Sequence, residues 1–348
     1  MRRLPIYFLI DVSESMVGEP IAQVDDGMRS IIQELRTDPY ALETVYVSVI
    51  AFAGKAKSLS PLTELNMFYP PKMPVGGGTA IGAALDYLMD DIDKSVQRTT
   101  ADFKGDWKPI VFLFTDGTAT DKPDKAIERW RQKYMSRCSM VCISIGENGD
   151  TAMLGKLTEN VLRLNSTDVV SFKAFFKWVT ASIKTSSMSV SDRGIDDICL
   201  APTKGINLEK VDTRVATRID ENFAVLPARC SNTKKMYLIK YAKKTSEIEG
   251  LGELGFNPNY FRLVGAYPVD EATYEGMSNG KSSHKINTTV LQGVPTCPCC
   301  GNQYGFVVCE CGNIMCHDGM RQVCPWCGTE GILTEGSGEG SNVGQGQG

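Results

Sequence analysis

Four apolar runs of strand length are the feature that most constrains how this 348-residue chain can fold. They occupy Leu4–Ile10, Thr44–Phe52, Pro109–Phe114 and Met140–Ile145. Stretches with helical periodicity alternate with them, over residues 21–36, 80–96, 124–134 and 169–184. A strand that is apolar on both faces is typical of a parallel sheet covered by helices on each side. The alternation therefore predicts an α/β domain with a doubly wound, mostly parallel sheet.

The pattern changes near residue 186, where we expect the first domain, residues 1–186, to end. Residues 187–198 are expected to form a linker, because Ser186–Gly194 is small, polar and without periodicity. Short β-type runs such as Phe223–Leu226 predict a smaller β-rich domain over residues 199–330. The glycine-rich residues 331–348 cannot bury enough apolar surface to order themselves, so they are expected to be a disordered tail.

Charge and hydropathy argue against nucleic acid as the default partner and against a membrane-spanning segment. The net charge is −4, and neither half of the chain has the basic surplus that drives nonspecific nucleic-acid binding. No stretch approaches the roughly 18 apolar residues of a membrane span. Asp11 closes the first apolar run without a cleavage site after it, so that run does not resemble a signal peptide. We therefore expect a cytoplasmic protein whose cysteines are thiols and not disulfides.

Three polar motifs follow predicted strands or precede predicted helices. A D-x-S-x-S motif over residues 11–15 comes directly after the first strand, Gly76–Thr79 precedes a helix, and Thr115–Gly117 ends a strand. In an open α/β sheet such segments gather outside the carboxyl ends of the strands, where ligands bind. The candidate ligands are Asp11, Ser13, Ser15, Thr79 and Asp116.

These five side chains offer only oxygen atoms, which suit Mg²⁺ at about 2.1 Å, or Mn²⁺. Three of them are neutral hydroxyls, so the ion stays electrophilic and keeps water that a partner carboxylate can displace. A helix N-cap and a turn residue would also explain a serine and an aspartate here, but three cooperating motifs favour a metal site. Gly76–Gly78 are expected to permit a close backbone approach to the metal.

Eight of the 12 cysteines lie between Cys297 and Cys327 in spacings typical of metal sites. Two C-x-x-C-G turns predict one structural Zn²⁺ site with four thiolate ligands, which leaves no open position for catalysis. Its predicted ligands are Cys297, Cys300, Cys324 and Cys327. A second zinc would use Cys309, Cys311, Cys316 and His317. Cys299 could replace one of these ligands, and the pairs could be exchanged between two ions.

Four cysteines stand apart from this group: Cys138, Cys142, Cys199 and Cys230. The first two lie in or beside an apolar strand and are expected to be buried and inert. Lysines with interleaved aromatic residues over 234–244 could bind a nucleic-acid strand, although a solvated strand face explains them as well.

The metal-site motifs resemble the von Willebrand factor A domain and its metal-ion-dependent adhesion site, over roughly residues 4–186. Together with CPCCGNQYGFVVCECGN and CPWCG, the chain from Leu4 to about Gly328 resembles the TerY family of bacterial tellurium-resistance-associated proteins, with its C-terminal metal-binding domain. The subset encoded beside a protein kinase and a metal-dependent protein phosphatase is the expected match. The resemblance implies a non-catalytic, partner-binding component of a phosphorylation-linked stress or defence system.

Two other functions remain as alternatives. A hydrolase could use the open metal to activate water, but residues 1–188 contain no histidine and Glu14 is the nearest candidate base. A zinc ribbon that binds nucleic acid would show a steep loss of affinity with salt.

Overall fold

The computed structural model describes residues 2–145, 150–164, 169–193, 201, 208–210, 223–245, 259–278, 285–319, 321–331 and 340–346. The chain divides into two compact units. The first contains Met1–Val12, Glu19–Pro74 and Thr79–Ile219. The second contains Asp220–Gly348 and, in addition, two short segments from earlier in the chain, Ser13–Gly18 and Val75–Gly78. Both short segments adjoin the motifs that the sequence marks as a metal site.

The first unit is built on a seven-stranded sheet with the order β3-β2-β1-β4-β5-β6-β7. Its strands are β1 (Leu4–Asp11), β2 (Val45–Phe52), β3 (Ala56–Glu64), β4 (Ile110–Thr115), β5 (Ser139–Ile145), β6 (Val161–Leu164) and β7 (Leu208–Lys210). The five central strands run parallel, whereas β3 and β7 pair antiparallel at the two edges. The predicted α/β class is confirmed, with a mixed sheet.

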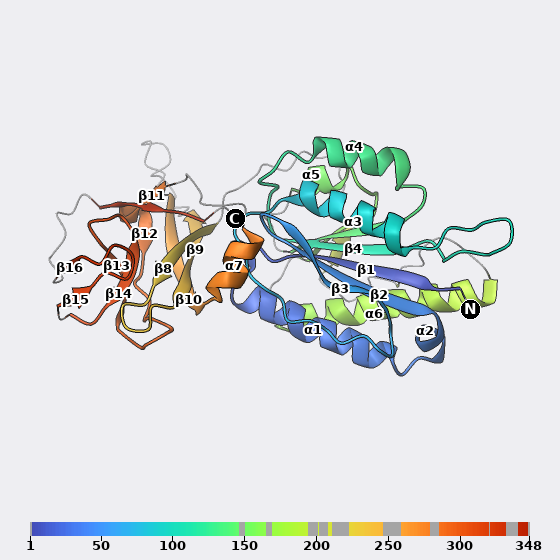
Figure 1. Ribbon diagram of the computed structural model, residues 1–348, viewed down its shortest axis with the longest axis horizontal. Helices are drawn as coiled ribbons and strands as arrows, with labels where there is room; N and C mark the ends of the chain where they lie inside the picture. The colour runs from blue at the N-terminus through green and yellow to red at the C-terminus, as the bar shows by residue number, and fades with distance from the viewer. Residues whose placement is uncertain are drawn as a thin grey trace. The chain divides into compact units, whose positions relative to one another are not determined.

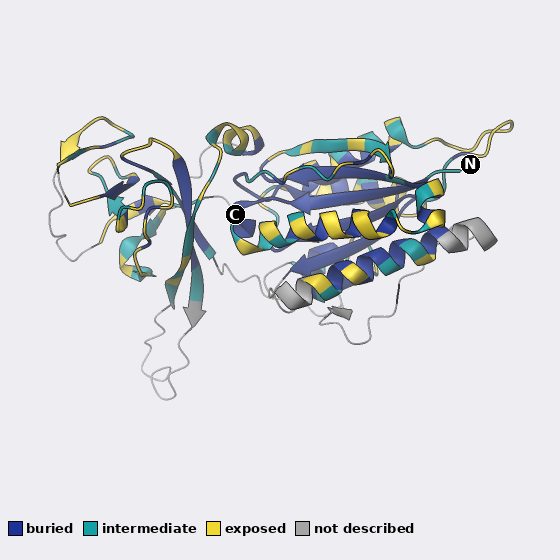
Figure 2. Cartoon of the chain, turned by 90° about the horizontal axis from the view of Figure 1, so that it is seen from below, coloured by how far each residue is buried: buried dark blue, intermediate teal, exposed yellow. Residues whose placement is uncertain are grey.

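Helices cover both faces of this sheet (Figure 1). They are α1 (Glu19–Leu35), α2 (Pro39–Thr44), α3 (Ile81–Ser95), α4 (Asp124–Lys133), α5 (Thr151–Leu154) and α6 (Val169–Arg193). In Figure 1, α1 and α6 lie on one face, and α3 and α4 lie on the other. Strands β1, β4 and β5 are buried along their whole length, as expected for strands covered on both sides (Figure 2).

Helix α6 corrects the predicted linker. It continues to Arg193, through most of residues 187–198, and the rest of that segment lies outside the described residues. Ser186 and Ser187 are buried, and Ser187 Oγ donates a hydrogen bond to the Lys184 carbonyl within the helix. Ser186 and Ser187 are therefore small, buried side chains of a helix and not part of an exposed linker.

The second unit is β-rich, as predicted, but its C-terminal part begins at Asp220 and not at residue 199, because β7 pairs with β6 in the first sheet. Its main sheet has six strands in the order β12-β10-β9-β8-β14-β13. These are β8 (Phe223–Arg229), β9 (Met236–Thr245), β10 (Asn259–Pro268), β12 (Leu291–Gln292), β13 (Tyr304–Val308) and β14 (Ile314–His317). Two smaller pairs join β11 (Lys285–Asn287) to β17 (Asn342–Gly344) and β15 (Gln322–Val323) to β16 (Glu330–Gly331). Helix α7 (Glu271–Met277) and two 3-10 turns, η1 (Glu14–Met16) and η3 (Thr288–Val290), complete this unit.

Strand β17 corrects the expected disordered tail. Val343 is fully buried and lies in the apolar core of the second unit, opposite Ile286 in β11. A single apolar residue within a glycine-rich segment is enough here because backbone pairing supplies the other contacts. Residues 332–339 and 347–348 of the predicted tail lie outside the described residues.

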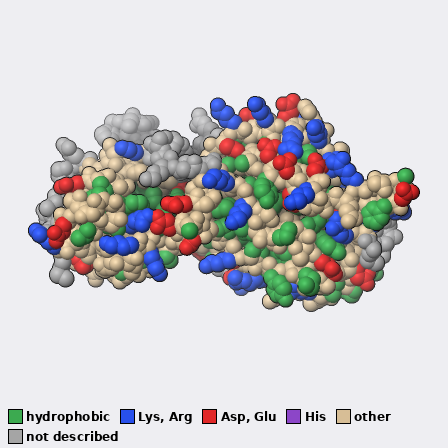
Figure 3. Space-filling model, in the orientation of Figure 1, with side chains coloured by type: hydrophobic (Ala, Val, Ile, Leu, Met, Phe, Trp, Pro, Cys, Tyr) green, Lys and Arg blue, Asp and Glu red, His purple; other side chains and the backbone are tan. Residues whose placement is uncertain are grey.

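Among the described residues, no helix is both long enough and apolar enough to cross a membrane. On the face drawn in Figure 3, basic and acidic side chains are interspersed over the first unit, in line with the near balance of charges in the sequence.

Candidate metal centres

Two of the predicted oxygen ligands lie at the carboxyl edge of the first sheet. Asp11 is the last residue of β1, and Asp116 follows the last residue of β4. These strands are parallel neighbours in the register Ile10↔Phe114, so both acids leave the sheet at the same edge. Thr115 Oγ1 donates a 2.6 Å hydrogen bond to Asp11 Oδ2 and fixes that carboxylate. This is the edge at which α/β sheets bind ligands.

Thr79 is held at the same edge by loops that follow strands. Its backbone N–H donates to Thr120 Oγ1 at 2.9 Å, and the Thr120 N–H donates back to the Thr79 carbonyl at 2.9 Å. The Ala80 N–H donates to the carbonyl of Ala53, just beyond β2, at 2.7 Å. Thr79 therefore precedes α3 in a loop that is tied to the loops following β2 and β4.

Ser13 and Ser15 lie in the tight turn that follows Asp11. The Met16 N–H donates to the Ser13 carbonyl at 3.0 Å, and the two serine Oγ atoms are 3.0 Å apart. Ligand oxygens at about 2.1 Å from an octahedral Mg²⁺ would be separated by about 3.0 Å along each edge, so the pair fits such an ion. The side chains of all five predicted oxygen ligands are buried, each exposed by 6% or less.

The thiols form two groups, each with four sulfurs within 4.8 Å of one another. We call Cys230, Cys297, Cys300 and Cys316 the first thiol cluster. We call Cys309, Cys311, Cys324 and Cys327 the second thiol cluster. This grouping differs from the predicted ligand sets: the two C-x-x-C turns lie in different clusters, and each joins another pair of cysteines, which is the exchange of pairs that the sequence analysis left open.

The sulfur spacings fit tetrahedral zinc. A tetrahedron with a Zn–S distance of about 2.3 Å has edges of about 3.8 Å. In the first thiol cluster, Cys316 Sγ lies 3.7 Å from Cys300 Sγ and 3.8 Å from Cys230 Sγ. In the second, the sulfurs of Cys309 and Cys327 are 3.7 Å apart, and those of Cys311 and Cys324 are 3.9 Å apart. Both clusters can therefore hold a closed, four-coordinate ion.

Three cysteine turns end on a glycine with a positive φ, two of them C-x-x-C-G turns and one, at Cys309, a shorter C-x-C-G turn. In each, a glycine N–H donates to the carbonyl of the first cysteine: Gly301 to Cys297 at 2.9 Å, Gly312 to Cys309 at 2.8 Å and Gly328 to Cys324 at 3.0 Å. All three glycines have a φ between 78° and 81°, which a side chain would disfavour. The glycine after each cysteine pair is therefore required by the turn that presents the thiols.

Cys230 is a ligand position that the sequence analysis missed. It follows β8, and β8 pairs in parallel with β14 in the register Met315↔Arg229, which brings Cys230 level with Cys316. Its turn repeats the pattern above, because the Lys234 N–H donates to the Cys230 carbonyl at 3.0 Å with a φ of 61° at Lys234. Lysine stands where the other turns have glycine, so no C-x-x-C-G signal marks this site.

Hydrogen bonds prepare one thiol in each cluster to act as a thiolate. Bonding to Thr329 lowers the pKa of Cys327 to about 6. Burial alone would raise the pKa of Cys230, but hydrogen bonds from the Thr233 side chain and backbone lower it to about 7. Because the thiolate is the form that binds metal, both groups favour ligation at neutral pH.

The remaining predicted positions are outside these clusters. His317 is buried in β14, and its Nδ1 accepts the Gly319 N–H at 3.0 Å, so it is not one of the grouped ligands. Cys299 is half-buried and belongs to neither cluster. Cys138 and Cys142 are buried, as predicted, and burial raises the pKa of Cys138 to about 12. Cys199 lies outside the described residues.

Two family models match this chain. One describes the von Willebrand factor type A domain and covers residues 6–177, and the other describes the TerY-C metal binding domain and covers residues 220–348. The chain therefore contains a von Willebrand factor type A domain and a TerY-C metal binding domain. The first match covers the sheet from β1 to β6 with its five predicted oxygen ligands, and the TerY-C match contains all eight clustered thiols.

Individual relatives are distant. Inter-alpha-trypsin inhibitor heavy chain H6 from Homo sapiens is 25% identical over 160 residues, which are 44% of this chain and 12% of that protein. The chain thus spans about an eighth of that relative's length.

Solved structures with similarity to the chain include three proteins. Proximal thread matrix protein 1 from the mussel byssus is 17% identical, with a TM-score of 0.40, over 52% of this chain and 48% of that one. A von Willebrand factor type A protein from Catenulispora acidiphila is 18% identical, with a TM-score of 0.40, over 53% and 43%. The ArnB paralog VWA2 from Sulfolobus acidocaldarius is 11% identical, with a TM-score of 0.37, over 78% and 66%.

Proposed function

We propose that this chain is a non-catalytic, cytoplasmic interaction protein that binds partner carboxylates through Mg²⁺ or Mn²⁺ at Asp11, Ser13, Ser15, Thr79 and Asp116. Its partners would be a protein kinase and a metal-dependent protein phosphatase of a bacterial system linked to tellurium resistance and protein phosphorylation. The family resemblance supports that setting, and the residues of this chain support the binding chemistry.

The observation that carries the proposal is the pair of serine hydroxyls 3.0 Å apart in the turn after Asp11. Neutral hydroxyls donate little charge to an ion, so a metal held there keeps affinity for an external carboxylate. The hydrogen bond from Thr115 to Asp11 holds the acid in one orientation. Such an outer hydrogen bond contributes to metal affinity in protein sites.

The two thiol clusters have a different role in this proposal. Four thiolates around zinc leave no position open for substrate or water, so both ions would be structural. They would hold together the β-rich domain on which a second surface for the partners is built.

Metal binding to the zinc-loaded full chain tests the proposal. Titration calorimetry with Mn²⁺ should show one site. Asp11→Ala or Asp116→Ala should weaken it by 10- to 100-fold, because the ion would be held by Ser13, Ser15 and Thr79 while the two carboxylates orient its water molecules from outside. Asp86→Ala is the matched control, because Asp86 is an exposed residue of α3 that pairs with Arg129. Equal Mn²⁺ affinity in the parent and Asp11→Ala would contradict the adhesion site.

Partner binding is tested in the native cell. A pull-down with the parent chain in Mg²⁺ should recover the kinase or the phosphatase, and EDTA or Asp11→Ala should abolish that recovery. Hydrolysis is the competing function, since an open metal can activate water. Metal-dependent turnover of generic phosphate esters that is lost in Asp11→Ala would favour it over a purely binding role.

A further inference from the structure

The segment Ser13–Gly18, which we call the β1 loop, is packed within the second unit. Val17 is 3% exposed and lies in an apolar cluster with Val225, Met236 and Leu238. The partly buried Val75, from the other short segment of this unit, packs against the same cluster. A buried valine is worth about 1.5–3 kcal/mol relative to an exposed one, so strands β8 and β9 give the loop an apolar anchor.

Lys240 fixes the same loop by a polar contact. It lies in β9, and its Nζ donates a hydrogen bond to the Ser15 carbonyl. The side chain is only 4% exposed, and its Nζ lies 4.4 Å from the centroid of the Phe223 ring. Lysine is rarely buried to this extent. Lys240 is therefore neither part of a solvated strand face nor free to contact a nucleic acid.

Helix α7 and the residue after it complete the contact. Tyr274 Oη donates to Glu14 Oε1, and the Gly77 N–H donates to Ser278 Oγ at 2.6 Å. A Cβ at Gly77 would lie 3.0 Å from Ser278 Oγ and 3.2 Å from Tyr274 Oη, which is tighter than ordinary contact. The expected reason for this glycine was a close approach to the metal, whereas here it admits Ser278 and Tyr274.

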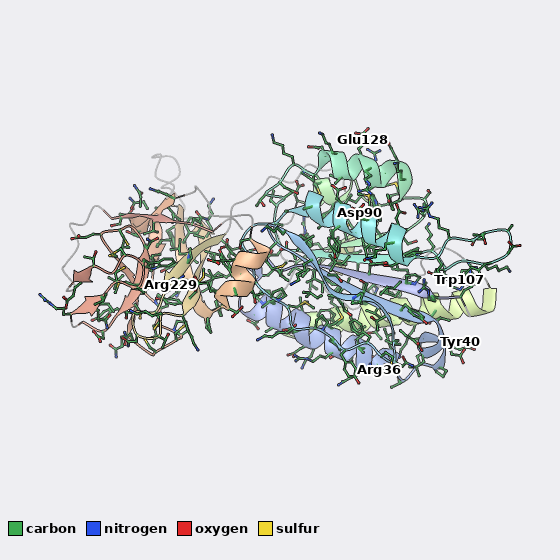
Figure 4. The ribbon with its side chains drawn as sticks, in the orientation of Figure 1. Arg36, Tyr40, Asp90, Trp107, Glu128 and Arg229 are labelled. Atoms are coloured by element: carbon green, nitrogen blue, oxygen red, sulfur yellow. The ribbon has the colours of Figure 1, made fainter. Side chains whose placement is uncertain are left out.

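Helix α7 is in turn held to the sheet of the second unit. Glu271 in its first turn forms an ion pair with Arg229, the last residue of β8 and labelled in Figure 4. The Arg229 guanidinium lies 4.7 Å from the centroid of the Trp326 ring, within range of a cation–π interaction. Helix α7, which contributes Tyr274 to the contact with the β1 loop, is thus held in place by β8 and Trp326 of the second unit.

We propose that Lys240 and Tyr274, which bond to the β1 loop, and Ser278, which bonds to Gly77 in the segment Val75–Gly78, form a latch that holds both segments in a covered state, and that an acidic segment of the partner gains access by displacing it. The inference rests on the proposed function, because Ser13 and Ser15 carry two of the oxygens that would bind the metal. Both are buried, yet a partner carboxylate must reach the ion beside them. A ligand that binds only the open state draws the equilibrium towards opening.

Hydrogen exchange of the zinc-loaded full chain, followed by mass spectrometry without Mg²⁺ or Mn²⁺, tests the latch. Tyr274→Phe, Lys240→Met and Ser278→Ala each remove one latch contact. Exchange should accelerate by about tenfold in peptides covering residues 13–18 and 75–78, as expected for loss of a buried hydrogen bond. Tyr304→Phe and Lys235→Met are matched controls on exposed side chains, and they should exchange like the parent. Unchanged protection of β1 and β14 shows that the variants are folded.

Mn²⁺ association supplies the second measurement. Opening the latch should raise the association rate of Mn²⁺ by a similar factor in the same variants but not in the controls. Unchanged exchange of residues 13–18 and 75–78 in all three variants would overturn the latch, as would slower Mn²⁺ association. Hydrogen exchange is measured without metal at this site, so it tests the latch independently of Mn²⁺ binding. If neither the parent nor any variant binds Mn²⁺, the proposed function fails, and the exchange data alone decide whether the latch exists.

Discussion

The two units of this chain differ in the side chains that fill their cores. The first buries large side chains against its sheet, among them Phe8, Phe112, Phe114 and Trp130. In the second, the apolar core includes Cys230, Cys297 and Cys316, which are three of the four members of the first thiol cluster. Three ligand positions of the first thiol cluster are therefore also positions of the apolar core. Metal loss should remove part of the core there, whereas in the first unit the metal would lie at the sheet edge.

Zinc removal should produce the largest difference in stability between the two units. A chelator selective for zinc over magnesium should remove protection from exchange in β8, β9 and β14 of the full chain, and leave β1, β4 and β5 protected. The reason is that structural zinc supplies about 10–16 kcal/mol of apparent binding free energy, which is also folding free energy. Regional hydrogen exchange by mass spectrometry measures the effect. Retained protection of β8 and β14 after complete zinc loss would mean that the apolar core alone suffices.

Substitution of one cysteine tests whether zinc stabilises the second unit in this way. Cys230→Ser should lower the zinc content from two ions to one and destabilise the second unit, because it removes one of the four thiolates of the first thiol cluster. Cys299→Ser is the matched control, since Cys299 is half-buried between two ligands but belongs to neither cluster. Native mass spectrometry counts the bound ions. Two ions in Cys230→Ser, or one in Cys299→Ser, would contradict the assignment of ligands.

The smallest effect concerns a surface network of the first unit, where charge and not metal supports the fold. Asp93 accepts hydrogen bonds from Tyr134 at 2.5 Å, Arg98 at 2.7 Å and Arg137 at 3.1 Å. Burial alone would raise the pKa of Asp93, but these bonds lower it to about 2, below its ordinary 3.8. The stabilisation is therefore full above about pH 4 and is lost as the pH falls towards 2.

Asp93→Asn should lower the free energy of unfolding by about 1 kcal/mol at pH 7, a small value because the carboxylate is 37% exposed and screened by solvent. The difference from the parent should shrink between about pH 4 and pH 2.5. Exchange of peptides from α3 and α4 measures it within the first unit. Asp102→Asn, on an exposed loop residue, is the control. A difference that is constant down to the lowest pH would show that the network carries no charge-dependent stability.

The sequence predicts what depends on local pattern. Continuous apolar runs identified β1, β4 and β5, because burial on both faces leaves no polar alternation. The five oxygen ligands were predicted because each follows a strand or precedes a helix, and their metal binding stays a prediction. The thiol pairs were found from C-x-x-C-G spacing, because the glycine is needed by the turn itself.

What depends on strand pairing could not be predicted. Cys230 and Cys316 meet only because β8 and β14 are parallel neighbours in one register, and 86 residues separate them along the chain. The Cys230 turn could not be recognised from the sequence, because Lys234 has the positive φ that belongs to a glycine in the other cysteine turns. Ser186 and Ser187 indicated a linker because serine has a low helix propensity, but both are buried in α6, where tertiary packing overrides that weak preference. Likewise, Lys240 and Tyr274 belong to no motif, and only the fold shows that they contact the β1 loop.

Because their ligands are spaced differently along the chain, the two thiol clusters are expected to form at different stages of folding. Cys309 and Cys327 are 18 residues apart, whereas Cys230 and Cys316 are 86 apart. Closing the longer loop costs about 1.4 kcal/mol more chain entropy, by the logarithmic dependence on loop length. The short-range cluster can therefore capture its ion as an early, local folding nucleus. The four thiols of the first thiol cluster come together only after β8 has paired with β14. A metal ion bound there would therefore show that the second unit has reached its final topology.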